Sequence, residues 1–132
     1  VEAWGTGNAT REFLYVADCA EAVVRAAVIY NESEPVNIGT GNEIKVSELM
    51  QLIARFTRFE GEIRWRTDKP DGQPRRRLDV SRAYEKFGFR AQMHFEEGLR
   101  RTIEWYETHR TAGGTPKISS SGIDGSQDSP SP

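Results

Sequence analysis

Apolar residues recur at helical spacing in the middle of the chain, between residues 46 and 56. The positions are Val46, Leu49, Met50, Ile53 and Phe56. Intervals of three and four residues place these side chains on one face of a helix. The pattern predicts an amphipathic helix that ends near Arg58 and turns its apolar face toward a core.

A second helical pattern lies near the end of the chain. Its apolar positions are Phe95, Leu99, Ile103 and Tyr106. Residues of opposite charge stand four positions apart on the other face, in the pairs Glu97/Arg101 and Arg100/Glu104. Such pairs meet on the surface of a helix. The segment is therefore predicted to form a helix with one buried face and one charged face.

Two further helices are predicted from their capping residues. Asp18, with Glu21 three residues later, fits the N-cap of a helix over residues 19–30. Ser81 likewise fits the cap of a short helix over residues 81–87.

Three short segments have strand character. Residues 13–16 are aromatic and β-branched, residues 36–38 precede a glycine pair, and residues 62–66 alternate between charged and apolar. Pro and Gly within residues 69–72 predict a type I turn. Strands that alternate with helices predict an α/β fold with a small sheet, although three strands are few for a complete one.

The length and composition are those of one domain. The chain has 132 residues, of which 36% are hydrophobic, enough for one modest core. We expect residues 1–110 to fold as one region. Residues 111–132 are rich in Gly, Ser and Pro and too poor in apolar residues to offset the entropy of ordering, so this tail is predicted to be disordered.

The sequence contains neither an apolar run of membrane-spanning length nor an export leader, so we expect a cytoplasmic protein without membrane contact. Cys19 is the only cysteine. It cannot form an internal disulfide and is too isolated for a metal cluster, so no metal site is predicted. We interpret Cys19 as a small core residue.

The charge is unevenly distributed along the chain. Residues 64–82 hold seven basic and three acidic side chains, whereas the whole chain has a net charge of −2. A local basic stretch in an acidic protein favours a bound anion of limited size. The alternative is a stand-alone polyanion-binding module that grips RNA, but aromatic residues are not interleaved with the basic run as single-strand binding requires.

Two motifs that invite a catalytic or cofactor interpretation are incomplete. Gly39-Thr40-Gly41 follows an apolar run, but the third glycine of a dinucleotide-binding loop would fall at Ile44. None of the four tyrosines has a lysine four residues later, the spacing that lets a tyrosine act as acid or base. We therefore predict no catalytic and no cofactor-binding residues in this chain.

Four groups of residues, in order and in register, resemble a known enzyme family. They are residues 4–7 with 11–16, residues 36–41, residues 69–76 with 78–81, and the final helix that ends in Trp105-Tyr106. Together they resemble the extended short-chain dehydrogenase/reductases that act on nucleotide sugars. The 69–76 segment is most similar to that of GDP-L-fucose synthases, and the resemblance covers about residues 1–109.

The resemblance implies that the chain is the C-terminal, substrate-binding fragment of an extended Rossmann-type enzyme. Arg11 would then contact the pyrophosphate, because a guanidinium stays charged and donates two parallel hydrogen bonds. Trp4 would offer a flat surface beside the nucleotide.

The loop over residues 69–76 carries the other residues that the resemblance implicates. Asp71 would accept hydrogen bonds from the ribose or the base, and Arg76 would add positive charge at the phosphates. Lys69 and Arg75 are second choices on the same loop.

The family also implies what the intact enzyme does. It would epimerise a GDP-linked 4-keto-6-deoxy sugar and reduce it with NADPH, with NAD as the alternative cofactor, and would form a homodimer without nucleic acid. The cofactor and the catalytic groups would lie upstream of Val1, so this chain alone is expected to be inactive. A generic NAD-dependent nucleotide-sugar epimerase/dehydratase is the second interpretation.

Overall fold

The computed structural model describes residues 1–111, which form short strands and longer helices. In chain order they are β1 (Glu2–Trp4), β2 (Thr10–Arg11), α1 (Val16–Ile29), β3 (Ile44–Lys45), α2 (Val46–Phe56), β4 (Arg64–Arg66), α3 (Ser81–Phe87) and α4 (Phe95–Thr111). β1 pairs in parallel with β4, and β2 pairs antiparallel with β3. The predicted α/β fold with small sheets is confirmed.

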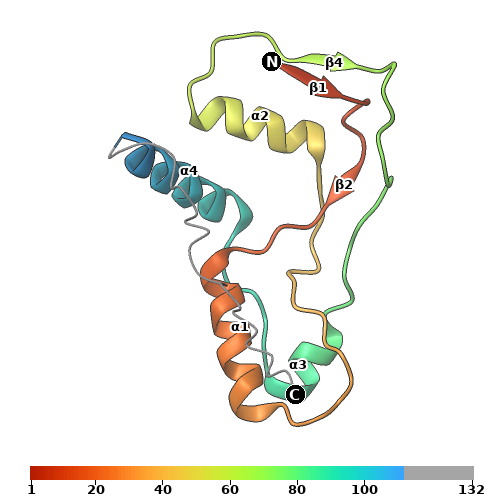
Figure 1. The fold of residues 1–132 in the computed structure, drawn as a ribbon, viewed down its shortest axis with the longest axis vertical. Coiled ribbons are helices and arrows are strands. Elements are labelled where there is room, and N and C mark those ends of the chain that lie inside the picture. The colour runs from red at the N-terminus through yellow and green to blue at the C-terminus, as the bar shows by residue number, and fades with distance from the viewer. Residues whose placement is uncertain (112–132) are drawn as a thin grey trace, which may run out of the picture.

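The elements are spread along the long axis of the molecule (Figure 1). β1 and β4 lie at one end, and α1 and α3 lie at the other. α4 packs against α2 in the upper half of the view. The segment after β4 runs past β2 on its way to α3, which brings residues far apart in sequence to one side of the molecule.

The core lies where α1 meets α3. Its buried members are Ala22, Ala83, Phe87 and Phe89. Ala22 and Ala83 have no exposed surface, and such small side chains allow the two helices to approach closely. Half-buried apolar side chains from residues 14, 36 and 38 pack around this cluster.

The opposite face of α1 is apolar and exposed. Val16, Val23, Val24 and Val28 are each more than half exposed, and Val28 is 80% exposed. The interpretation of Cys19 as a core residue was wrong, because its side chain is also exposed. The buried residues of α1 are Asp18 and Ala22, so Cys19 does not lie on the buried face of the helix.

The predicted start of α1 is corrected by the position of Asp18. The helix begins at Val16, and Asp18 lies buried in its first turn instead of capping it. The Asp18 carboxylate accepts hydrogen bonds from the backbone N–H groups of Gln92, at 3.2 Å, and Met93, at 2.9 Å. Asp18 therefore ties α1 to the segment that leads into α4.

Two predicted strands, over residues 13–16 and 36–38, do not form in the described part of the chain. Strand character reflects how well a side chain packs against neighbouring strands, and neither segment has a paired strand among residues 1–111. Phe13 instead contacts Phe95, with ring centroids 5.8 Å apart. Val36 and Ile38 pack on the α1–α3 core without pairing.

The predicted helix over residues 46–58 is confirmed as α2, and the 62–66 strand is confirmed in part as β4. The backbone N–H of Val46 donates to the carbonyl of Ala9, and that of Ser47 donates to the carbonyl of Gly7, each at 3.0 Å. These bonds satisfy helix donors that otherwise lack partners. They also anchor the segment between β1 and β2 to α2.

The turn predicted at residues 69–72 lies three residues earlier. The backbone N–H of Lys69 donates to the carbonyl of Arg66 at 3.0 Å, which closes the turn directly after β4. Gly72 has a positive φ of 73°, a conformation that glycine adopts without strain.

The short helix predicted from residue 81 is confirmed as α3, but its cap was predicted wrongly. Ser81 is the first helical residue, and Asp79 accepts the hydrogen bond from its backbone N–H at 3.0 Å. The first backbone N–H groups of a helix have no partner within the helix. Here the carboxylate of Asp79, two residues before the helix begins, accepts the hydrogen bond from one of them.

The last predicted helix is confirmed as α4, and one of its two predicted ion pairs forms. Glu97 and Arg101 pair at 2.7 Å. Tyr106, predicted to lie on the buried face, is 57% exposed. Arg100 lies over the ring of Phe56, 4.5 Å from its centroid, instead of pairing with Glu104.

Within residues 1–111, every helix is too short or too polar to span a lipid bilayer. α4 reaches Thr111, the first residue of the tail that was predicted to be disordered. The rest of that prediction, residues 112–132, lies outside the described residues.

Candidate functional site

The six predicted site residues lie on two backbone stretches that run side by side. The backbone N–H of Thr10 donates to the carbonyl of Pro74 at 2.9 Å, and that of Arg76 donates to the carbonyl of Thr10 at 3.3 Å. Residues 69–76 therefore follow β1 and β2 along one edge. The first stretch carries Trp4 and Arg11, and the second carries Lys69, Asp71, Arg75 and Arg76.

Trp4 and Lys69 come together because β1 and β4 are paired. Trp4 is the last residue of β1, and its side chain is 70% exposed. The ammonium of Lys69 lies 6.0 Å from the centroid of the Trp4 ring, the outer limit of a cation–π contact. The pair forms an open aromatic surface with a positive charge beside it.

Asp71 closes the turn between β1 and β2. Its two carboxylate oxygens accept hydrogen bonds from the backbone N–H of Thr6, at 2.5 Å, and the Thr6 hydroxyl, at 2.7 Å. The bond from the hydroxyl has the largest effect on the pKa of Asp71, and together the two bonds hold this pKa below its ordinary value. Gly5 has a φ of 83°, and a Cβ atom there would overlap the Asp71 carboxylate.

Arg11 is half-buried and anchored by one nitrogen. Its Nη1 donates to the carbonyl oxygens of Thr10, at 2.7 Å, and Gln73, at 2.8 Å. Its Nη2 lies over Gly72, where an added Cβ atom would be 3.8 Å away. Among the residues that the structure describes, Nε and Nη2 have no hydrogen-bond acceptor, so two donors of a fixed fork remain open.

Arg75 is engaged by Glu43. The Glu43 carboxylate accepts hydrogen bonds from Arg75 Nε at 2.9 Å and Nη2 at 2.6 Å, and from the Thr10 hydroxyl at 2.8 Å. Only 16% of the Glu43 side chain is exposed. The hydrogen bonds from Arg75, and next the bond from Thr10, lower the pKa of Glu43 to about 2.

The lowered pKa of Glu43 leads to a prediction about acid stability. A carboxylate whose pKa falls from 4.5 when unfolded to about 2 when folded contributes stability that is complete above the unfolded pKa and lost as pH falls through the folded one. Glu43→Gln should flatten the decline of the unfolding midpoint between about pH 5 and about pH 2. Equal slopes in wild type and Glu43→Gln would contradict the assignment.

Arg76 extends from the same loop without an internal partner. Its side chain is exposed, and its guanidinium forms no ion pair or hydrogen bond within residues 1–110. Arg75 and Arg76 are adjacent, yet one is bound inward by Glu43 and the other is open. Arg11 and Arg76 therefore carry guanidinium groups on this edge that form no ion pair with the described residues, whereas the ammonium of Lys69 lies 3.9 Å from the carboxylate of Asp68.

A cavity among the described residues borders this edge at Glu43, the residue that binds Arg75. It measures about 1050 Å³ and is lined by α2 and the segment before α4, together with Phe13 and Glu43. None of the six predicted residues lines it. A shallower hollow of about 650 Å³ borders the basic loop and is lined by Arg75, Arg77 and the residues up to Ser81.

Comparison with known proteins places the chain in a family. Residues 1–39 match the NAD dependent epimerase/dehydratase family. GDP-L-fucose synthase 1 of Arabidopsis thaliana is 41% identical over 106 residues, which is 80% of this chain and 32% of that protein. This chain is a GDP-L-fucose synthase-like member of the NAD-dependent epimerase/dehydratase family. It spans about a third of the length of the curated relatives it matches.

Two solved structures, each at least 25% identical to this chain, share the fold. A UDP-glucose 4-epimerase from Thermotoga maritima, solved with UDP-glucose, has a TM-score of 0.75 and 30% identity, covering 83% of this chain and 35% of that one. RMD from Pseudomonas aeruginosa, complexed with NADPH, has a TM-score of 0.73 and 25% identity, covering 83% of this chain and 36% of that one.

The described residues of this family member do not themselves fit a dinucleotide cofactor. The Gly39–Gly41 turn is the segment closest to a phosphate-binding loop, but the N–H groups of Thr40 and Gly41 are both bound to the Glu12 carboxylate. A cofactor phosphate at that turn would meet a negative charge instead of free donors.

Three residues that hold this edge together were not predicted from the sequence. Thr6, Glu12 and Glu43 each form hydrogen bonds that hold the two stretches together. Glu12 could have been found from its place beside Arg11, because adjacent residues of an extended chain point to opposite sides. Nothing in the sequence paired Glu43 with Arg75, which is 32 residues away.

Proposed function

We propose that this chain is the nucleotide-binding part of a GDP-L-fucose synthase-like enzyme. In this proposal, Arg11 and Arg76 hold the diphosphate of a GDP-sugar, Lys69 adds charge, and Trp4 lies against the nucleotide. The observation that carries it is the half-anchored guanidinium of Arg11, whose Nη1 is fixed while Nε and Nη2 stay open. A pre-oriented fork of this kind suits a phosphate oxygen pair.

The two remaining predicted residues take supporting roles in the proposal. Asp71 is already bound by Thr6, and Arg75 is already bound by Glu43. Both therefore hold the loop that presents Arg76 and Lys69, and direct contact with the ligand is not required of them.

The chemistry of the whole protein is part of the same proposal. It would epimerise a GDP-linked 4-keto-6-deoxymannose and reduce the product with NADPH, as a cytoplasmic homodimer. Hydride transfer is the chemistry that the cofactor supplies. The residues described here would bind and orient the sugar nucleotide, and binding energy gained far from the reacting carbon can be used to align it.

Turnover by the full-length protein tests this proposal. We expect NADPH absorbance to fall when GDP-4-keto-6-deoxymannose is added, and to stay constant with the corresponding UDP- and dTDP-linked sugars. A parallel reaction without sugar nucleotide controls for background oxidation. NADPH consumption with a UDP- or dTDP-linked sugar but not with the GDP-linked one would reject GDP-L-fucose synthase activity in favour of the generic epimerase/dehydratase interpretation.

Calorimetry with GDP and with a short RNA, each at two salt concentrations, tests the polyanion alternative. Affinity for RNA above that for GDP, with a steep fall as salt rises, would support that alternative.

A further inference from the structure

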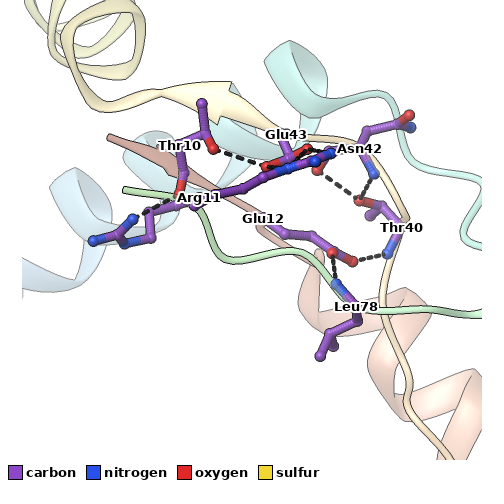
Figure 2. Close-up of polar contacts among 8 residues, drawn as sticks. Thr10, Arg11, Glu12, Thr40, Asn42, Glu43 and Leu78 are labelled. Carbon is purple, nitrogen blue, oxygen red and sulfur yellow. Dashed lines mark hydrogen bonds and ion pairs between the residues drawn. The ribbon is translucent and has the colours of Figure 1, made fainter. Parts of the chain in front are cut away.

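Glu12 binds three backbone N–H groups that come from two distant parts of the chain. Its Oε1 accepts from Thr40, at 2.6 Å, and Gly41, at 3.0 Å, and its Oε2 accepts from Leu78 at 2.9 Å. Figure 2 shows the carboxylate lying between Thr40 and Leu78. The side chain therefore joins β2, the Gly39–Gly41 turn and the end of the basic loop.

The Gly39–Gly41 turn is shaped around this carboxylate. A Cβ atom at Gly39 would overlap Glu12, and Gly41 has a φ of 73°. Successive backbone N–H groups that converge in such a turn form a concavity for an anion. Here the anion is a side chain of the same chain, which gives the glycine motif a purpose other than cofactor binding.

The Glu12 carboxylate is held in its charged form. Partial burial on its own would raise the pKa of Glu12, but the backbone N–H groups of Leu78, Gly41 and Thr40 outweigh this, so the pKa lies below its ordinary value. A charged carboxylate forms stronger hydrogen bonds with N–H donors than a neutral acceptor does.

Glu12 directly follows Arg11, and the two side chains point to opposite sides of the backbone (Figure 2). On one side Glu12 is fixed to the turn and to Leu78, which follows the basic run at residues 75–77. On the other side Arg11 reaches the carbonyl of Gln73. β2 has only two residues, and the backbone bonds of Thr10 with Pro74 and Arg76 hold one side of it to the loop. Glu12 adds a second attachment, to Leu78 and the Gly39–Gly41 turn, directly after Arg11.

We propose that Glu12 is a positioning residue, which fixes the spacing between Arg11 and Arg76 so that both meet the two phosphates of a nucleoside diphosphate. The inference rests on the proposed function, because it concerns how that site is held. It assigns Glu12 no contact with the ligand. Glu12→Gln keeps the shape of the side chain but turns an amide donor toward a backbone N–H, which breaks at least one of the three bonds.

A double-mutant cycle in the full-length protein tests this role. GDP affinity is measured by calorimetry for wild type, Arg11→Ala, Glu12→Gln and the double variant, and KM and kcat are measured with the sugar nucleotide. We expect Glu12→Gln to weaken GDP binding roughly tenfold and to raise KM by a similar factor, with a smaller change in kcat. The double variant should lose less affinity than the product of the two single losses.

Two further variants make the result decisive. Glu97→Gln removes a carboxylate from an exposed ion pair on α4 and should leave GDP affinity unchanged. Glu12→Asp keeps the charge on a shorter side chain, and its affinity should lie between those of wild type and Glu12→Gln. It also provides a measurement if Glu12→Gln fails to fold.

The outcomes separate this inference from the proposal on which it rests. If wild type does not bind GDP, or Arg11→Ala binds it as well as wild type, the proposed function fails and the inference falls with it. If Arg11→Ala weakens binding but Glu12→Gln does not, only the positioning role is overturned. Losses that multiply fully in the double variant would also overturn it, because Glu12 would then act independently of Arg11.

Discussion

Replacing Arg11 with alanine in the full-length protein is expected to weaken GDP binding by roughly 10- to 100-fold. A hydrogen bond to a charged group contributes about 1.5–3 kcal/mol, and each 1.4 kcal/mol corresponds to about a tenfold change in the dissociation constant. The Arg11 guanidinium is held by the carbonyls of Thr10 and Gln73, so little conformational entropy is lost when its open N–H groups meet a phosphate. Calorimetry with GDP at fixed salt concentration measures the effect.

Two matched variants show whether charge or geometry is responsible. Arg11→Lys retains the positive charge but not the planar fork, so its affinity should lie between those of wild type and Arg11→Ala. Arg101→Ala removes an arginine whose partner is Glu97 on the exposed face of α4 and should bind GDP normally. Unchanged affinity in Arg11→Ala would remove Arg11 from the site.

Replacing Phe87 with alanine is expected to destabilise the α1–α3 region by roughly 3–5 kcal/mol. Phe87 is only 4% exposed and packs edge-on against Tyr30, with ring centroids 5.9 Å apart. The neighbours Ala22 and Ala83 are too small to fill the space that the ring would leave. The change is measured by denaturant unfolding, and in a longer protein by hydrogen exchange of the α1 and α3 amides.

Tyr84→Ala is the matched control, because Tyr84 lies on the same helix and is 49% exposed. Arg90 lies over its ring at 3.8 Å, a contact that contributes about 1 kcal/mol at an exposed site. The loss should therefore stay near that value. Equal losses for Phe87→Ala and Tyr84→Ala would indicate that the α1–α3 cluster is not the core of this region.

Helices were predictable from the sequence where periodicity or helix-forming composition was sufficient. The spacing in residues 46–56 and 95–106 depends on local geometry alone, so α2 and α4 formed as expected. Asp18 had the local features of a cap, but its carboxylate found partners 74 and 75 residues away. Residues 36–38 had strand character, yet a strand also needs a neighbour, and none of the described residues pairs with them.

In the candidate site, too, local motifs were predictable and contacts between distant residues were not. Motifs in the sequence identified Arg11 and the 69–76 loop, and the structure places them side by side. The sequence alone could not predict the hydrogen bonds between Asp71 and Thr6 or between Arg75 and Glu43. These bonds depend on how β1, β2 and the loop are arranged in space. The same holds for Glu12, whose partners are separated from it by 28 to 66 residues.

The Glu12 carboxylate occupies the anion-binding turn at Gly39–Gly41 as a ligand that belongs to the same chain. A tethered group is present at an effective concentration of about a millimolar or more, and in the folded chain it does not diffuse away. Free phosphate would have to displace it to reach the Gly39–Gly41 turn. The donors of that turn are therefore not available to anions in solution, whereas Nε and Nη2 of Arg11, on the other side of the backbone, have no acceptor among the described residues.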